Sequence, residues 1–292
     1  MKILLSMFGV FINCTLFSQS NFPALSATGS VKQVVGFTTI TVDYERPAAR
    51  ERKIFGGLVP YGEIWRTGAG KCTKITFDRA VIIENKNVSA GTYSVFTIPG
   101  ADQWTIILNS DTSLYGAGRY DTAKDVLRFP VTPSATKRFY ESFTIDIDVV
   151  PNNALIYLSW EQTQVRFFVE TDTDKKTVLY IDKKLMTGES SNADEYAAAV
   201  EYYFFQNKNL DQALTLIDNA IKRNGRESWF YNLKVDVLEK QGKYAEATRA
   251  AKSHLDLLEL HGKEFGWDDE TLRVAVEGAR NRVAHLSRMS GN

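Results

Sequence analysis

The chain has little cysteine and little histidine, and both shortages narrow the chemistry open to it. Only Cys14 and Cys72 occur among 292 residues, and removal of an N-terminal leader would leave Cys72 alone, so we expect no intramolecular disulfide. All three histidines, His254, His261 and His285, lie near the C-terminus. We therefore expect no Ser–His–Asp, Cys–His or HExxH site before the first of them, and we interpret Cys72 as a half-buried strand residue.

The chain also lacks an excess of charge of either sign. Lysine plus arginine and aspartate plus glutamate number 35 each, so the formal net charge is zero. A nucleic-acid-binding protein shows a basic excess or patch, and so does a polybasic protein that binds membrane surfaces. We predict neither partner. We also predict no cofactor and no metal, because carboxylate pairs such as Asp146 and Asp148 offer fewer oxygen ligands than calcium requires.

Long apolar runs are missing everywhere except at the N-terminus. Lys2 precedes the apolar run Ile3–Phe17, which is followed by small and polar residues. A run of about 15 residues is short for a membrane span and typical of a signal peptide, which we predict at residues 1–20. A lipoprotein anchored through Cys14 is the less favoured alternative. We expect the mature chain to be secreted, periplasmic or bound to the cell envelope, with no membrane span.

Residues 25–170 have the pattern of an antiparallel β-sandwich or barrel-like domain. Short runs rich in Val, Ile, Thr, Tyr and Phe alternate with turn residues, and no helical period separates them. Residues 34–44 are predicted to form one strand. Residues 81–83 are expected to lead through a turn at 85–87 into a return strand at 92–98.

The hydrophobic period becomes helical after the polar stretch 171–192, which we predict to be a linker. Asn192 or Ser191 is expected to cap the next helix. The segment 209–222 recurs 34 residues later as 243–256, and a further helical pattern precedes each copy. This spacing is typical of tetratricopeptide repeats, so we predict a short α-helical repeat domain over residues 193–290, whose final helix caps the open end.

Two blocks of the β region resemble a secreted bacterial family, domain-of-unknown-function family twenty-nine-eleven. The first block, residues 52–69, reads RKIFGGLVPYGEIWRTGA, and the second, residues 90–100, reads AGTYSVFTIPG. The sequence departs from the family at Gly70-Lys71-Cys72, where an asparagine and an acidic residue are more usual. The resemblance implies a β-domain, often followed by tetratricopeptide-like helices, and it implies no known activity.

Unusual residues concentrate in the segment 46–67, which glycines and prolines mark as a loop. The rings of Tyr61 and Trp65 suit a sugar ring or a side chain, and the guanidinium groups of Arg52 and Arg66 suit carboxylates. The candidate binding loop therefore contains Arg46, Arg52, Tyr61, Glu63, Trp65 and Arg66. In the alternative interpretation, Trp65 fills the core and Arg66 pairs with Glu63 to hold the loop.

Two functions remain open from the sequence. The first is a non-catalytic binding module that interacts with a protein or peptide through the helical repeats. By resemblance to tetratricopeptide repeats, the groove positions are Tyr202, Phe205, Asn232, Asp236 and Glu239. The alternative is a carbohydrate-binding or glycan-hydrolysing protein that uses the 46–67 loop. Catalysis is not favoured, because the spacing of the carboxylates nominates no acid–base pair.

Overall fold

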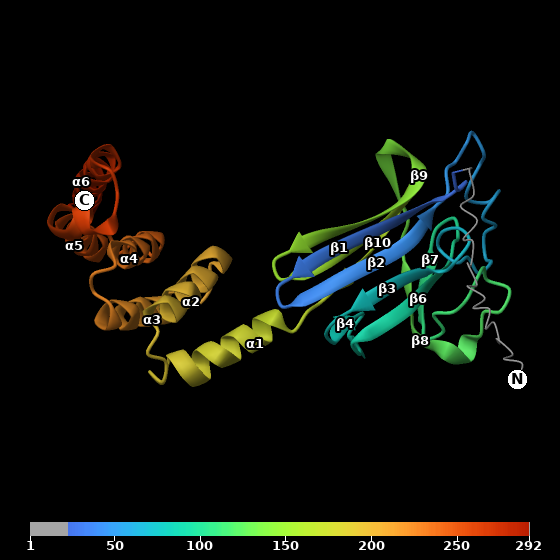
Figure 1. Cartoon of the computed structure of the whole chain (residues 1–292), viewed down its shortest axis with the longest axis horizontal. Helices are drawn as coiled ribbons and strands as arrows, with labels where there is room; N and C mark the ends of the chain where they lie inside the picture. Colours follow the sequence, from blue (N-terminus) through green and yellow to red (C-terminus); the bar gives the residue numbers. More distant parts are fainter. Residues whose placement is uncertain (1–22, 292) are drawn as a thin grey trace, which may run out of the picture. The chain divides into compact units, whose positions relative to one another are not determined.

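The computed structural model describes residues 23–291, which divide into two compact units (Figure 1). The first unit ends at Thr173 and the second begins at Asp174. The first is built from antiparallel strands and the second from helices, so the predicted order of a β region followed by a helical region is confirmed. The predicted signal peptide and Cys14 lie outside the described residues.

The β unit is dominated by a six-stranded antiparallel sheet in the order β1-β2-β3-β6-β7-β8. Two hairpins complete it, β4–β5 and the much longer β9–β10. Its strands are β1 (Ala27–Val35), β2 (Thr38–Arg46), β3 (Thr73–Phe77), β4 (Val81–Ile83), β5 (Lys86–Val88), β6 (Gly91–Ile98), β7 (Trp104–Asn109), β8 (Asp125–Val131), β9 (Ser134–Val150) and β10 (Asn153–Val169).

The hydrophobic core lies between the inner faces of the six-stranded sheet and the β9–β10 hairpin. Alternate residues of β2 are buried, and the same alternation runs through the first half of β10, because successive side chains of a strand point to opposite faces. Buried side chains from both sets of strands form one cluster. An isolated bridge from Ala48 to Ser142 joins the end of β2 to β9, and another from Ile82 to Glu170 joins β4 to the end of β10.

One predicted strand and one predicted turn are wrong in detail. The expected strand 34–44 is divided by a tight turn at Gly36 and Phe37, and its halves belong to the paired strands β1 and β2. The turn expected at 85–87 lies at Glu84 and Asn85, both left-handed with φ of 49° and 59°. Strand β5 is therefore the return strand of β4, whereas β6 pairs with β3. Periodicity locates strands well, but it does not fix which strands pair.

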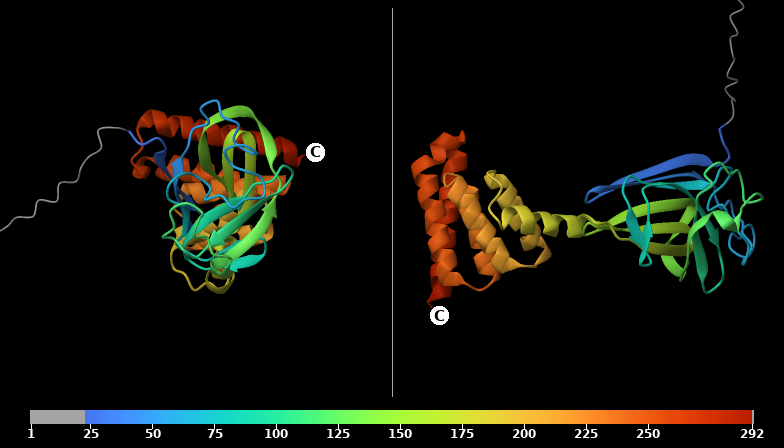
Figure 2. Two further views of the ribbon diagram at one scale, coloured as in Figure 1. Left: turned by 90° about the vertical axis from the view of Figure 1, so that its right-hand side faces the viewer. Right: turned by 90° about the horizontal axis from the view of Figure 1, so that it is seen from below.

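The helical unit arranges its main helices one after another in sequence order (Figure 2). Each of α2 to α5 packs against the next helix along the chain, as expected for short connections. Its helices are α1 (Thr173–Tyr180), α2 (Ala193–Gln206), α3 (Leu210–Arg223), α4 (Ser228–Lys240), α5 (Tyr244–His261) and α6 (Asp269–Ser290).

The stretch 171–192, predicted as a linker, contains α1 and a π-helical turn at Ile181–Leu185. The two residues that bound this turn are 1% exposed and pack into the core between α2 and α3. They lie four positions apart, so they share one helical face, and this short apolar signal is hidden among charged neighbours. Asn192 caps α2 as predicted, because its side chain accepts a hydrogen bond from the Asp194 amide.

Helices α3 and α5 occupy matching places in the two helix pairs. They begin at Leu210 and Tyr244, which are 34 positions apart, and the equivalent Ala213 and Ala247 are fully buried. The small side chains allow close packing of the paired helices. Among the helices of residues 23–291, none is long and apolar enough to cross a membrane.

Candidate functional site

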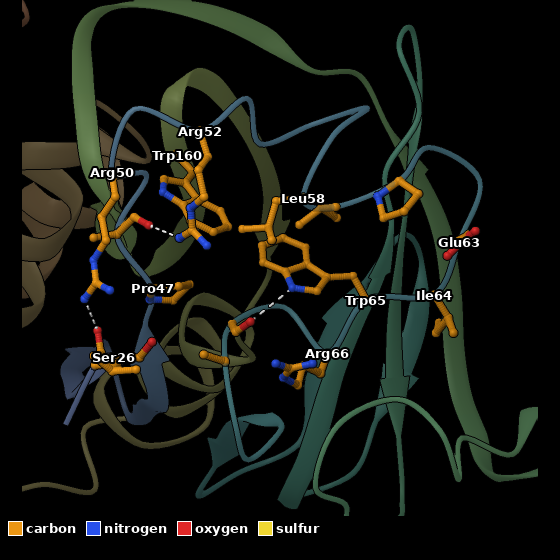
Figure 3. Close-up of a pocket in the computed structure, with 16 residues that line it drawn as sticks. Ser26, Pro47, Arg50, Arg52, Leu58, Glu63, Ile64, Trp65, Arg66 and Trp160 are labelled. Carbon is orange, nitrogen blue, oxygen red and sulfur yellow. Dashed lines mark hydrogen bonds between the residues drawn. The ribbon is translucent and has the colours of Figure 1, made fainter.

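The candidate site is a cavity of about 410 Å³ in the β unit, bordered by the segment that connects β2 to β3 (Figure 3). That segment, residues 47–69, supplies most of the lining. Trp160 of β10 and residues 25–26, just before β1, complete the wall. Parts of the chain that are far apart in sequence therefore meet here.

Backbone hydrogen bonds hold the start of this segment against β9. The Phe143 amide donates to the Pro47 carbonyl at 2.9 Å, and the Ala49 amide donates to the Glu141 carbonyl at 2.7 Å. Between these anchors and the loop, Arg50 and Glu51 both adopt left-handed conformations, with φ of 48° and 59°. Consecutive non-glycine residues with positive φ are strained and persist only where surrounding structure holds them, often next to a binding site.

Trp65 is a core residue, as the structural interpretation of the loop predicted. It is 7% exposed, and its indole nitrogen donates to the Gly68 carbonyl at 3.0 Å. Its ring stacks on Trp160 at 5.8 Å between centroids and meets Phe55, Trp104 and Phe143 edge to face. Its backbone bridges Thr97 of β6. With its ring enclosed on these sides, Trp65 presents little surface on which a sugar could stack.

Arg50 and Arg52 line the cavity, and both side chains are exposed (Figure 3). Arg50 Nη2 donates to the Leu25 carbonyl at 2.9 Å. Arg52 donates from Nε to the Ala49 carbonyl at 3.0 Å and from Nη2 to the Ala48 carbonyl at 2.7 Å. All these acceptors are neutral, so the hydrogen bonds position both guanidinium groups without neutralising their charges.

Arg66 lines the same cavity and is half-buried. Its Nε is shielded from solvent and has no hydrogen-bond partner within residues 23–291. The expected ion pair between Arg66 and Glu63 is not formed among residues 23–291, so this part of the sequence prediction is wrong. Glu63 lies at the other side of Trp65 and is exposed, with its carboxylate directed away from the arginines (Figure 3).

The remaining members of the candidate loop lie apart from the cavity lining. Tyr61 is 47% exposed, and its ring packs over Gly56. Arg46, at the end of β2, donates from Nε to the Phe143 carbonyl at 3.1 Å and from Nη2 to Thr144 Oγ1 at 2.9 Å. Arg46 therefore joins β2 to β9, a structural role for which its position in the sequence gave no signal.

Cys72 lies close to the site but is a packing residue. It is 3% exposed, and its thiol donates to the Gly116 carbonyl at 3.2 Å. Burial raises the pKa of the Cys72 thiol to about 11, although the positive charge of Arg66 opposes this shift. The thiol is therefore protonated at neutral pH, unlike the thiolate that a cysteine nucleophile requires.

Two lining residues of the cavity were not predicted from the sequence. They are Trp160 and Leu58. Trp160 lies on β10, and no local pattern says that it stacks on Trp65. Leu58 carried one usable signal, since it lies in the glycine-rich part of the loop. Within residues 23–291, no three His, Cys, Asp or Glu side chains gather where they could hold a metal ion.

The predicted groove residues of the second helix pair come together around one arginine of α6. Arg282 donates to Asn232 Oδ1 at 2.9 Å, Asp236 Oδ1 at 2.5 Å and Glu239 Oε2 at 2.7 Å. Desolvation opposes the charge of Arg282, and the two carboxylates outweigh it, so the pKa of Arg282 is raised. These three groove positions thus bind the last helix of the chain itself.

The predicted groove residues of the first pair have a different environment. The Tyr202 hydroxyl donates to Asp174 Oδ1 at 2.7 Å, and burial raises its pKa to about 12. Phe205 is 78% exposed. It is therefore the groove position on α2 whose side chain is most open to a partner.

Residues 26–169 match the model of the family described as Protein of unknown function (DUF2911). This match covers the β unit and supports the resemblance of the two sequence blocks to that family. No curated protein and no solved structure matches the chain.

Proposed function

We propose that this chain is a non-catalytic binding protein of the cell envelope or the extracellular space, which uses its helical unit to bind a protein or peptide. The helical unit consists of two tetratricopeptide-type repeats, α2–α3 and α4–α5, closed by α6. The 34-residue offset between Leu210 and Tyr244, with buried alanines at equivalent positions, carries this proposal. The finer description of the β unit as a sandwich is part of the same proposal, supported by its shared core.

Phe205 is the expected contact for the partner. Its ring is 78% exposed on α2, next to Phe204, whose ring lies under the Lys240 ammonium group at 4.3 Å. Exposed aromatic side chains beside a cation are frequent anchors of protein interfaces. Asn232, Asp236 and Glu239 are already bound to α6, so we assign them to stabilisation of the unit.

A site-specific photo-crosslinker tests this proposal. A benzophenone amino acid at position 205 is expected to give crosslinked products in the native host, and the same group at exposed Arg249 on α5 is the control. The partner identified should then bind the purified chain, with Phe205→Ala weakening the complex by about tenfold or more. Equal crosslinking at both positions, or unchanged affinity of the variant, would contradict the assignment.

Secretion rests on the N-terminal sequence. Residues 1–20 combine Lys2, an apolar run and a polar end, as a signal peptide does. Mass spectrometry of the N-terminus from the native host is expected to show cleavage near residue 20. An intact Met1 would contradict secretion, and a lipid on Cys14 would favour the anchored alternative.

Carbohydrate binding is the second candidate, and one observation favours it. The ring of Tyr61 is 47% exposed at the surface of the loop and is available to stack on a sugar. A glycan array on the purified chain, repeated with Tyr61→Ala, tests it. Sugar binding that disappears in this variant would support the second candidate over the first.

A further inference from the structure

The cavity beside residues 47–69 holds more positive charge than the surrounding residues neutralise. Arg50, Arg52 and Arg66 line it, and among residues 23–291 Glu63 is its only acidic lining residue. Among residues 23–291, none of these arginines is in an ion pair. Two further carboxylates lie beside this segment and accept hydrogen bonds from backbone amides: Glu141 Oε1 from Arg50 at 2.8 Å, and Glu45 Oε1 from Lys71 at 3.1 Å.

Arg66 is the strongest indication that something is bound here. Its Nε is buried, and the described part of the chain offers it no acceptor. Buried donors are almost always paired, because water lost on burial must be replaced, and the requirement is stronger for a charged group. An acceptor that enters the cavity would replace this lost hydration.

Most of the remaining lining residues are apolar, and they indicate what the rest of the ligand must be. Side chains of tryptophan, proline, leucine, valine, isoleucine and alanine surround the guanidinium groups: Pro47, Ala48, Leu58, Val59, Pro60, Ile64, Trp65, Ala69 and Trp160. A volume of about 410 Å³ lies in the range of small-molecule sites, roughly 300–1,000 Å³. A free inorganic anion would satisfy the charge and leave this apolar wall uncovered.

We propose that the cavity binds a small organic acid with an apolar body. Its carboxylate accepts hydrogen bonds from Arg66, whose planar donors match the geometry of a carboxylate, and Arg50 and Arg52 add positive charge to the same cavity. Its apolar body contacts the apolar side chains that line the cavity, among which Leu58 is exposed. The left-handed backbone of Arg50 and Glu51 holds the charged side of the cavity in place before the ligand arrives. This site belongs to the β unit and does not depend on the partner proposed for the helical unit.

Isothermal titration calorimetry of the full chain tests the site with matched acid and amide probes. The acids are phenylacetate and hexanoate, and the neutral partners are phenylacetamide and hexanamide. Each acid is expected to bind about tenfold or more tightly than its amide, because only the acid forms charge-assisted hydrogen bonds. Galacturonate and galactose serve as a third pair. Galacturonate keeps the carboxylate but lacks an apolar body, and galactose is its neutral partner.

Variants locate the binding. Arg66→Met is expected to weaken acid binding by about tenfold or more and to leave the amides unchanged. It should fold normally, since among residues 23–291 Arg66 forms no ion pair and its Nε has no hydrogen-bond partner. Arg66→Lys keeps the charge and loses the planar guanidinium group. Its affinity for the acids is therefore expected to lie between those of the unchanged chain and Arg66→Met. Arg79→Met, at an exposed arginine outside the cavity, is the matched control. Arg50→Met provides a second, independent test of the cavity.

Three results would overturn the proposal. The first is that neither phenylacetate nor hexanoate binds at concentrations up to about 10 mM, which is weaker than a specific site should be. The second is that acids and amides bind equally, or that Arg66→Met and Arg79→Met have the same affinity. The third is that galacturonate binds and the apolar acids do not, which would move the cavity to the carbohydrate candidate.

Discussion

Replacement of Trp65 by alanine tests whether the 47–69 segment is held by its own packing. Trp65 is 7% exposed, and its ring contacts four other aromatic rings. Truncation of a buried tryptophan costs about 3–5 kcal/mol, and the lost hydrogen bond to the Gly68 carbonyl adds about 1 kcal/mol.

This cost is large compared with the stability of an ordinary domain. A unit of this size loses about 2–4 °C of melting temperature per kcal/mol, so Trp65→Ala is expected to lower the melting temperature of the β unit by more than about 8 °C. Scanning calorimetry and urea unfolding of the purified chain measure it, and Tyr61→Ala, in the same loop but 47% exposed, is the matched control. A shift within about 2 °C for Trp65→Ala, or an equal shift for the control, would refute the reasoning.

Three further experiments test other parts of the molecule. With a pKa of about 11, Cys72 should react with iodoacetamide at pH 8 about 100-fold more slowly than an unhindered thiol, and rapid labelling would contradict its burial. Arg282→Met removes the group that bridges α4 and α6 and should cost about 1–2 kcal/mol in urea unfolding, a modest value because the site is partly exposed. Gly36→Ala places a Cβ 2.2 Å from Thr173 Oγ1 at a φ of +56°. It should therefore destabilise the β unit more than Gly62→Ala, where φ is +78° and no described atom lies within 4 Å of the new Cβ. Equal losses of unfolding free energy would contradict this.

The sequence predicted the architecture because architecture follows from local periodicity. Alternation in β2 and β10 indicated strands buried on one face, and the repeat that pairs Ala213 with Ala247 indicated matching helices. The pairing of the strands was harder to predict from the sequence. The turn at Glu84 and Asn85 requires two left-handed residues, a conformation that glutamate rarely adopts, so composition gave no reason to place it there.

The candidate site was only half visible in the sequence for a related reason. The loop supplied Arg52, Arg66 and Trp65 as neighbours along the chain, which made it conspicuous. Their division into a core ring and cavity-lining cations depends on Trp160, which arrives from β10. The same distance effect hid the true partners of Asp236 and Glu239, because Arg282 lies on the last helix.

The long β9–β10 hairpin also constrains the order in which the β unit folds. Tyr44 of β2 hydrogen-bonds to Ile145 of β9, and Phe37 to Thr173, contacts that span 101 and 136 positions of the chain. Such distant contacts close large loops and form slowly. During synthesis, the inner face of β2 therefore has no covering layer until almost the whole unit has emerged. A nascent or truncated chain that ends before β9 exposes this apolar face, so it is prone to aggregation.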